Sequence, residues 1–279
     1  MVYKTAANKL KIQTPYTAID MGNAGESNIM KHTLGTILDR MMPSDYISEE
    51  EVGVELDEFL EAKEHLLPTS GPFIEDMLYE AVSQIKDGKA PGPDRIPGKA
   101  IKEGLPILKK ELLLIYQDCQ RLGYFPDQWK KGKLVTIPKG RDDIDITDIK
   151  NWRPLTMVSE LGEVLKRLIG ISAKRHLGGD GLSDCQYGFR KNRSSVQAIQ
   201  KVLEISNANR NKHVMFISLD IKGAFDNVRW PAALEAIINK GYPKSEVGLW
   251  RSYFNRRVVQ LDDSEIKVSK NLTKAQCSK

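Results

Sequence analysis

Residues 213–230 read HVMFISLDIKGAFDNVRW, and the interpretation of the whole chain depends on this stretch. An apolar run from Val214 to Leu219 ends at Asp220, and Asp226 follows directly after Phe225. The run is too apolar for a half-exposed strand, which predicts a strand in the centre of a sheet. We therefore expect Asp220 at the rim of that sheet, where its carboxylate can reach a cleft.

A carboxylate in this position suits a magnesium ion. Mg²⁺ prefers one or two carboxylates together with substrate phosphates and water. Asp220 and the backbone carbonyl of Ile221 are the candidate ligands. Asp226 is a further candidate, although in a strand-to-helix turn it suits an N-cap equally well. Spacing alone also leaves open the plainer interpretation that Asp220 is a capping or turn residue.

Composition indicates a globular, reduced protein. The 279 residues are 41% hydrophobic and 28% charged, which is ordinary for a globular chain. No stretch reaches the roughly 18 apolar residues of a membrane span, and the start lacks the apolar core of a secretory signal. The cysteines, Cys119, Cys185 and Cys277, are scattered and odd in number. We therefore expect no disulfide partner, no membrane and a reducing compartment.

Charge divides the chain in two. Residues 1–70 hold 6 Lys and Arg against 12 Asp and Glu, whereas the whole chain has a net charge of +5. This predicts an acidic leader over 1–70, partly helical or disordered, before a basic folded body over 71–279. A basic body favours a polyanionic partner such as nucleic acid. Many surface lysines without such a partner would explain the net charge equally well.

The body combines helices with a few strands. Apolar periodicity predicts a strand within 132–140, a polar loop returning to a buried turn over 141–157, and a hairpin over 258–269 that turns at DDSE. In the second helix, the side chains from Leu105 through Cys119 to Leu122 form one predicted core stripe, and Gly88 is placed to cap the first helix. The expected class is α+β, helix-rich with a small antiparallel sheet. Helices are predicted over 74–85, 105–123, 159–177, from Ser194 or Ser195 onward, over 230–243 and over 244–257.

Five segments in order carry a family resemblance. They are KAPGPDRIP at 89–97, KLVTIPKG at 133–140, NWRPLTM at 151–157, QYGFRKNRSS at 186–195 and LDIKGAFDNV at 219–228. Together they resemble the reverse transcriptases of LINE-type (non-LTR) retrotransposons, with Trp152 where the family usually has tyrosine. Maturases of group II introns share the motif order and are the nearest enzymatic alternative. An unrelated α+β interaction protein with accidental matches is the alternative outside the enzymes.

The resemblance implies a right-hand polymerase fold with fingers and a partial palm. It also implies magnesium-dependent addition of deoxynucleoside triphosphates to a DNA primer on an RNA template, inside the cell, in cytoplasm and nucleus. Asp220, with Ile221, would hold the metal, and Phe225 would be the steric gate against the ribose 2′-hydroxyl. Fingers cations that bind the triphosphate align with Lys139 and Arg153. Template or primer phosphates would meet Arg190, Lys191 and Arg193.

One family motif has no counterpart in the expected place. The aromatic-x-Asp-Asp hairpin that completes metal binding follows a Gly-x-Pro-Gln-Gly-Ser segment, and neither is found. Asp262 and Asp263 belong instead to the predicted hairpin at 258–269, where acidic residues form a turn. The expectation is therefore a domain truncated before its second acidic motif, inactive as an isolated chain. The corresponding alternative is a remnant that binds nucleic acid without catalysis.

Overall fold

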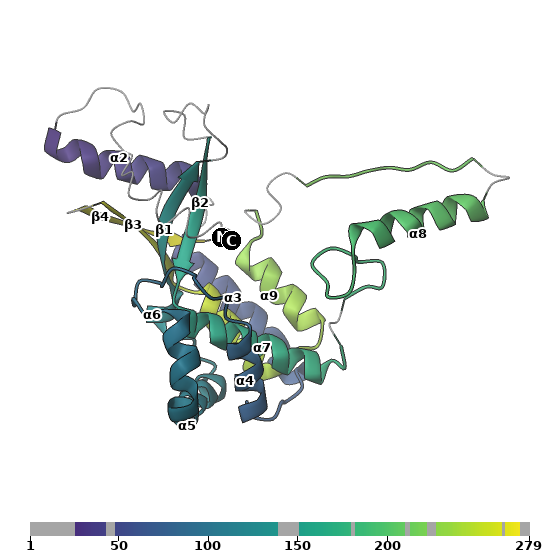
Figure 1. Cartoon of the computed structure of the whole chain (residues 1–279), viewed down its shortest axis with the longest axis horizontal. Helices are drawn as coiled ribbons and strands as arrows, with labels where there is room; N and C mark the ends of the chain where they lie inside the picture. Colours follow the sequence, from purple (N-terminus) through teal and green to yellow (C-terminus); the bar gives the residue numbers. More distant parts are fainter. Residues whose placement is uncertain are drawn as a thin grey trace.

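A computed structural model of the chain gives the positions of most of the residues (Figure 1). It describes residues 26–42, 48–138, 151–179, 182–209, 213–221, 227–263 and 266–273. Lys139, Phe225 and Asp226 therefore lie outside the described residues. Among the described helices, none is both long and apolar enough to cross a membrane.

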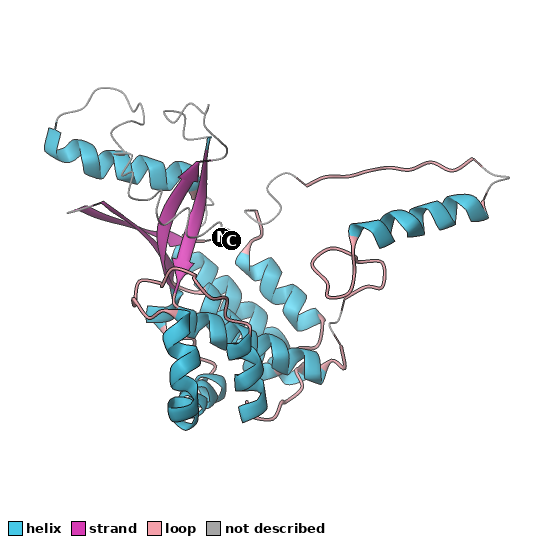
Figure 2. Cartoon of the chain, in the orientation of Figure 1, coloured by secondary structure: helices cyan, strands magenta, loops and turns pink. Residues whose placement is uncertain are grey.

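Helices dominate the described ranges, and one small sheet accompanies them (Figure 2). The helices are α2 (Glu26–Met41), α3 (Glu49–Lys63), η2 (Glu64–Leu66), α4 (Glu75–Ser83), α5 (Gly98–Leu122), α6 (Asp127–Lys130), α7 (Glu160–His176), α8 (Ser195–Ala208), α9 (Trp230–Asn239) and α10 (Lys244–Phe254). The strands are β1 (Lys131–Pro138), β2 (Trp152–Val158), β3 (Arg257–Asp263) and β4 (Ile266–Leu272).

The sheet is mixed rather than antiparallel, which corrects the expectation. Its order is β2-β1-β3-β4, and the two hairpins β1–β2 and β3–β4 join through a parallel pairing of β1 with β3. The predicted hairpin at 258–269 is confirmed, because Asp263 pairs with Ile266. The predicted buried turn was wrong, since its residues form β2. As an edge strand, β2 tolerates Pro154, which has no N–H to donate to a neighbour.

The main core lies between α7 and the helices around it. Four α7 side chains predicted to share one face are completely buried: Val164, Leu165, Leu168 and Ile169. Helix α4 packs on α7 and α5, and α10 packs on α5 and α9. From the acidic leader, α3 adds Val52 and Leu56 to this core, while α2 packs on β4 over a second, smaller core. In the described part of 1–70, helices α2 and α3 therefore both pack on elements of the body.

Two details of α4 and α5 differ from the sequence prediction. Helix α4 ends at Ser83 with Gln84 as its C-cap, and Gly88 takes its positive φ of 74° in the following loop. On α5, Cys119 is buried as predicted, and burial raises the pKa of its thiol to about 11. Three side chains of the predicted stripe do not belong to the core. Leu108, Ile115 and Leu122 are 49%, 46% and 62% exposed.

A buried lysine joins α6 to the end of α10. Lys130 is only 3% exposed and donates to the backbone carbonyls of Ser252 and Asn255, each at 3.0 Å. Its ammonium also forms an ion pair with Asp127 at 2.6 Å. The hydrogen bond from Lys130 lowers the pKa of the Asp127 carboxyl. Short α6 is thereby fixed where the chain enters β1.

The strand predicted at Val214 to Leu219 is not formed, so this expectation was wrong. Residues 213–221 run as an extended segment outside the sheet, and all nine are exposed. Met215, Ile217 and Leu219 are 83%, 76% and 88% exposed. A strand needs a neighbour to satisfy its N–H and C=O groups, and the described part of the chain places none beside this segment.

Candidate nucleic-acid interface

Arg153 lies in the β1–β2 hairpin. The register pairs Ile137 with Arg153 and Pro138 with Trp152, so Arg153 stands opposite the end of the Ile-Pro-Lys strand. Trp152 is buried and fixes the start of β2, whereas Arg153 is exposed. Lys139, the second predicted triphosphate ligand, follows Pro138 directly but is outside the described residues. A cation at this end of a hairpin is accessible to an anionic ligand.

The predicted basic cluster lies in the loop that leads into α8. The guanidinium groups of Arg190 and Arg193 both approach the Asp184 carboxylate, at 3.9 and 3.8 Å. Arg190 also donates to the carbonyl of Ser183 at 2.9 Å, and Arg193 lies over the Tyr187 ring, 5.4 Å from its centroid. The structure therefore brings these two arginines together. Lys191, between them in sequence, is exposed.

Local geometry holds this basic loop in shape. Ser194 caps α8 in a full capping box, accepting from the Gln197 N–H while the Gln197 side chain accepts from the Ser194 N–H. The Ser194 N-cap was one of the two predicted starts of the helix. Phe189 and Asn192 have positive φ values of 56° and 61°, and the Phe189 ring is 94% exposed. The loop thus presents basic groups next to aromatic ones, a combination that suits single-stranded nucleic acid.

Asp220 and Ile221 lie in the extended segment 213–221, and both are exposed. One carboxylate and a backbone carbonyl fit the oxygen ligands that Mg²⁺ takes from proteins. Within the described ranges, however, no group of three or more His, Cys, Asp or Glu side chains could hold a metal ion. The donor chemistry of Asp220 therefore fits magnesium, but the described residues do not assemble a complete site around it. Phe225, the predicted steric gate, lies outside them.

Asp262 lies in the predicted hairpin, but within strand β3 rather than in its turn. It pairs with Lys267 across the β3–β4 hairpin, and its Oδ2 atom lies 3.5 Å from the ammonium of Lys133 on β1. This carboxylate thus bridges two hairpins of the sheet.

The predicted site residues occupy separate parts of the molecule. Figure 1 shows the sheet that carries Arg153 on one side of the helical body, and α8 with its preceding loop on the other. The extended segment that holds Asp220 lies beyond the body on the α8 side. The structure thus unites the cations of 190–193 with one another, but it does not unite them with Arg153.

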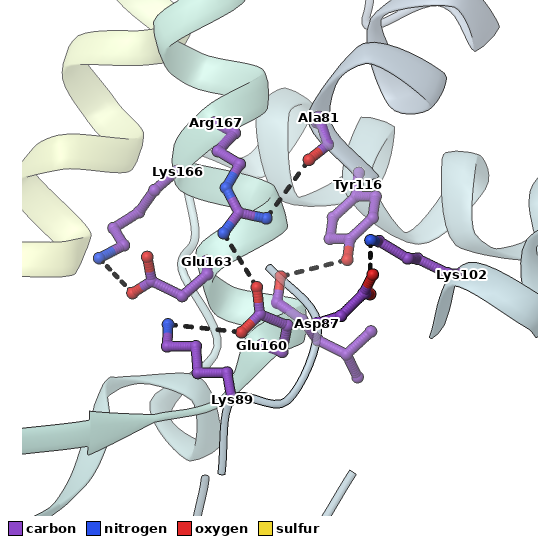
Figure 3. Close-up of polar contacts among 10 residues, drawn as sticks. Ala81, Asp87, Lys89, Lys102, Tyr116, Glu160, Glu163, Lys166 and Arg167 are labelled. Atoms are coloured by element: carbon purple, nitrogen blue, oxygen red, sulfur yellow. Dashed lines mark hydrogen bonds and ion pairs between the residues drawn. The ribbon is translucent and has the colours of Figure 1, made fainter. Parts of the chain in front are cut away.

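A second polar cluster was missed from the sequence (Figure 3). Glu160, at the start of α7 and only 5% exposed, accepts from Arg167 at 2.9 Å and lies 3.5 Å from the ammonium of Lys89. Arg167 donates in turn to the carbonyl of Ala81 in α4. Lys89 opens the KAPGPD segment, so this buried carboxylate joins that loop and α4 to α7. A glutamate directly after a helix-capping position carries no sequence signal for such a role, because Glu is common in any first helical turn.

Known proteins match the chain over the segments just described. Residues 137–275 match the sequence profile of the family "Reverse transcriptase (RNA-dependent DNA polymerase)". The match begins at the end of β1 and covers the basic loop, α8 and the segment with Asp220. The chain belongs to the reverse transcriptase family, and the helix-rich fold with its small sheet is a part of that domain.

Its relatives are proteins of non-LTR retrotransposons. A 115 kDa protein of the type-1 retrotransposable element R1DM of Drosophila melanogaster is 32% identical over 189 residues, 67% of this chain. The Pol polyprotein of element R1 from Bradysia coprophila is 29% identical over 71% of the chain, and the RNA-directed DNA polymerase of the mobile element jockey from D. melanogaster is 28% identical over 70%. These alignments cover 18%, 20% and 21% of the relatives. The chain therefore spans about a fifth of their length.

Proposed function

We propose that the chain provides the fingers and the first palm motif of an RNA-directed DNA polymerase that copies a retrotransposon RNA. Its partners would be an RNA template, a DNA primer and deoxynucleoside triphosphates, in the cytoplasm and nucleus. The observation that carries this proposal is the family match over 137–275, which includes each of the segments that hold the candidate cations and Asp220. The relatives are retrotransposon proteins, which favours this class of polymerase over the maturases of group II introns.

The proposal assigns two different tasks to the candidate cations. Arg153 suits an incoming triphosphate, because a guanidinium can bind phosphate oxygens bidentately. Lys139 would add a point charge beside it. The cations of the basic loop, Arg190, Lys191 and Arg193, would meet the backbone of the template or primer. Their net charge remains positive after Asp184 has neutralised one of them, which favours a polyanion.

Magnesium is the proposed cofactor, with Asp220 and the Ile221 carbonyl as protein ligands and substrate phosphates and water as the others. When bound, the ion would activate the primer hydroxyl and stabilise the pyrophosphate leaving group. The contribution of this chain is an exposed carboxylate that a nucleotide can approach. Phe225 would exclude a ribose 2′-hydroxyl by its bulk.

Binding is tested with a fluorescent RNA–DNA primer–template duplex at a series of salt concentrations. We expect log K to fall linearly with log salt, and the slope to become shallower by about one for each phosphate contact removed. The variants are Lys191→Gln and Arg193→Gln. Arg121→Gln is the control, since Arg121 is also accessible to solvent, 68% exposed against 34% for Arg193, but lies on α5. Equal losses in all three variants would refute a role for the basic loop.

Catalysis is tested separately with the same duplex, deoxynucleotides and Mg²⁺. Extension that disappears in Asp220→Ala would establish the polymerase in this chain. Binding without extension would favour the second candidate, a nucleic-acid-binding segment without chemistry. That candidate is favoured by one observation, the absence of any cluster of metal-binding side chains within the described ranges. Failure of both binding and extension would refute the proposed function.

A further inference from the structure

A cleft opens between the C-terminal end of α5 and helix α10, and residues 69–72 form its third wall. Its volume is about 760 Å³, within the range of about 300–1,000 Å³ that is usual for small-molecule sites. Helix α5 lies across the helical body from α8 (Figure 1). None of the described residues that the proposed function uses lines the cleft, which is therefore a separate feature of the helical body.

Glycine backbones keep the cleft open. Nothing lies within 4 Å of the position that a Cβ atom would take at Gly71, so this residue faces open space. At the end of α5, Gly123 forms the C-cap with a positive φ of 59°. A Cβ atom at Gly248 of α10 would lie 3.4 Å from the Cα atom of Gly123, so the two backbones approach closely. These parts of the wall are backbone rather than long side chains, which leaves room for a flat group.

A buried carboxylate holds the polar floor of the cleft in place. This floor consists of Ser70, Gln120 and Ser245, which donate to Glu246 at 3.0, 3.2 and 2.7 Å. Glu246 is 0% exposed and Gln120 is 5% exposed. Each serine hydroxyl has one hydrogen and directs it to Glu246, so its oxygen can only accept from a molecule in the cleft. The floor therefore presents fixed acceptors, which suit a ligand with hydroxyl donors.

Cations lie at the rim of the same cleft. Lys244 is exposed at the start of α10, and Arg251 lies further along the same helix. Arg251 forms an ion pair with Asp57, but a guanidinium has five N–H donors and can bind a second acceptor. A third lining cation, Arg121, is paired with Asp118 at 2.9 Å. The lining residues thus hold three cations against one carboxylate, which favours an anionic group near Lys244 and Arg251.

We propose that this cleft binds a ribonucleoside phosphate, with its phosphate at Lys244 and Arg251 and its ribose over the floor. The ribose offers hydroxyl donors to the acceptors of the floor, and the phosphate offers oxygens to the cations at the rim. The flat base fits against the glycine backbones of the wall. A free ribonucleotide and the unpaired end of an RNA strand share this chemistry. The site does not depend on the proposed polymerase chemistry.

Isothermal titration calorimetry of the full chain with AMP, in a buffer without divalent metal ions, tests the site. We expect one AMP per chain, and Lys244→Gln should weaken binding about fivefold or more because a charged contact is lost. Lys110→Gln, at an exposed lysine on α5, is the matched control and should leave the affinity unchanged. Gly71→Phe should fill the cleft and abolish binding. Gly179→Phe, at a second glycine with open space around it, should not affect binding.

Two other ligands test the recognition of ribose. 2′-Deoxy-AMP lacks one hydroxyl donor and inorganic phosphate lacks the whole nucleoside, so both should bind more weakly than AMP. Competition with a short single-stranded RNA then identifies the source of the ligand. An RNA that binds more tightly than AMP indicates a strand end, and one that binds more weakly indicates a free nucleotide.

The cleft is distinguished from the proposed polymerase site by Arg153→Gln, which should leave AMP binding unchanged because Arg153 lies on β2. Loss of AMP binding in Arg153→Gln but not in Lys244→Gln would overturn the proposal. So would a chain that does not bind AMP, equal affinity for AMP, 2′-deoxy-AMP and phosphate, or AMP binding by a folded Gly71→Phe variant. If Gly71→Phe does not fold, equal affinities of Lys244→Gln and Lys110→Gln would overturn it.

Discussion

Gly92 lies at the centre of the KAPGPD segment, and replacing it with alanine should destabilise the fold. A Cβ atom at this position would meet the backbone where β2 ends and α7 begins. It would lie 2.5 Å from the carbonyl carbon of Val158 and 2.7 Å from the amide nitrogen of Ser159, with the Val158 oxygen also in contact. Ordinary contacts to a Cβ begin at 3.4 Å, so about 0.9 Å of space is missing.

None of the atoms involved can move easily. Gly92 stands between Pro91 and Pro93, whose rings fix the backbone on both sides. Val158 is paired with Gly132 in the sheet, and Ser159 is buried at the start of α7. The clash is with backbone rather than with the end of a flexible side chain. We therefore expect a loss of about 1–3 kcal/mol in the free energy of unfolding, the usual range for overpacking.

Gly71→Ala is the matched control for this substitution. Nothing lies within 4 Å of a Cβ at Gly71, so alanine there only restricts the unfolded chain and should stabilise by up to about 1 kcal/mol. Urea unfolding followed by far-UV circular dichroism gives both values, provided that the slope m is unchanged. If Gly92→Ala were as stable as Gly71→Ala, the KAPGPD loop would not lie against the β2–α7 junction.

Three further outcomes follow from buried or ionised groups. Glu160→Gln should lower the free energy of unfolding in urea by about 1–3 kcal/mol, because it weakens the contacts of a buried carboxylate to two cations. Glu103→Gln, at the surface, should lower it by less than about 0.5 kcal/mol. The pKa of Asp127 is lowered in the folded chain, so its carboxylate stabilises the fold at neutral pH, and this stabilisation is lost as the pH falls through the lowered pKa. In Asp127→Asn the free energy of unfolding, measured in urea at a series of pH values, should therefore fall less steeply at acid pH. With the C-terminal cysteine replaced by serine, a thiol reagent should modify exposed Cys185 quickly and buried Cys119 only on unfolding, and equal rates would contradict the burial of Cys119.

Elements encoded by neighbouring residues were predictable from the sequence. The start of α8 follows from Ser194 and Gln197, three residues apart, and the buried face of α7 follows from its helical spacing. The approach of Arg190 to Arg193 is also local, because one short loop holds both. Contacts between distant segments had no such signal. The parallel pairing of Lys131 with Val258, which makes the sheet mixed, joins residues far apart in sequence, and apolar periodicity does not specify a partner.

The stretch at 213–221 shows why a strand is harder to predict than a helix. A helix satisfies its backbone within its own residues, so α8 forms although none of its side chains is buried. A strand satisfies its backbone only through a neighbour, and the described part of the chain offers none to this segment. The large apolar side chains that predicted a central strand indicate a segment suited to pairing, but they do not specify the neighbouring strand.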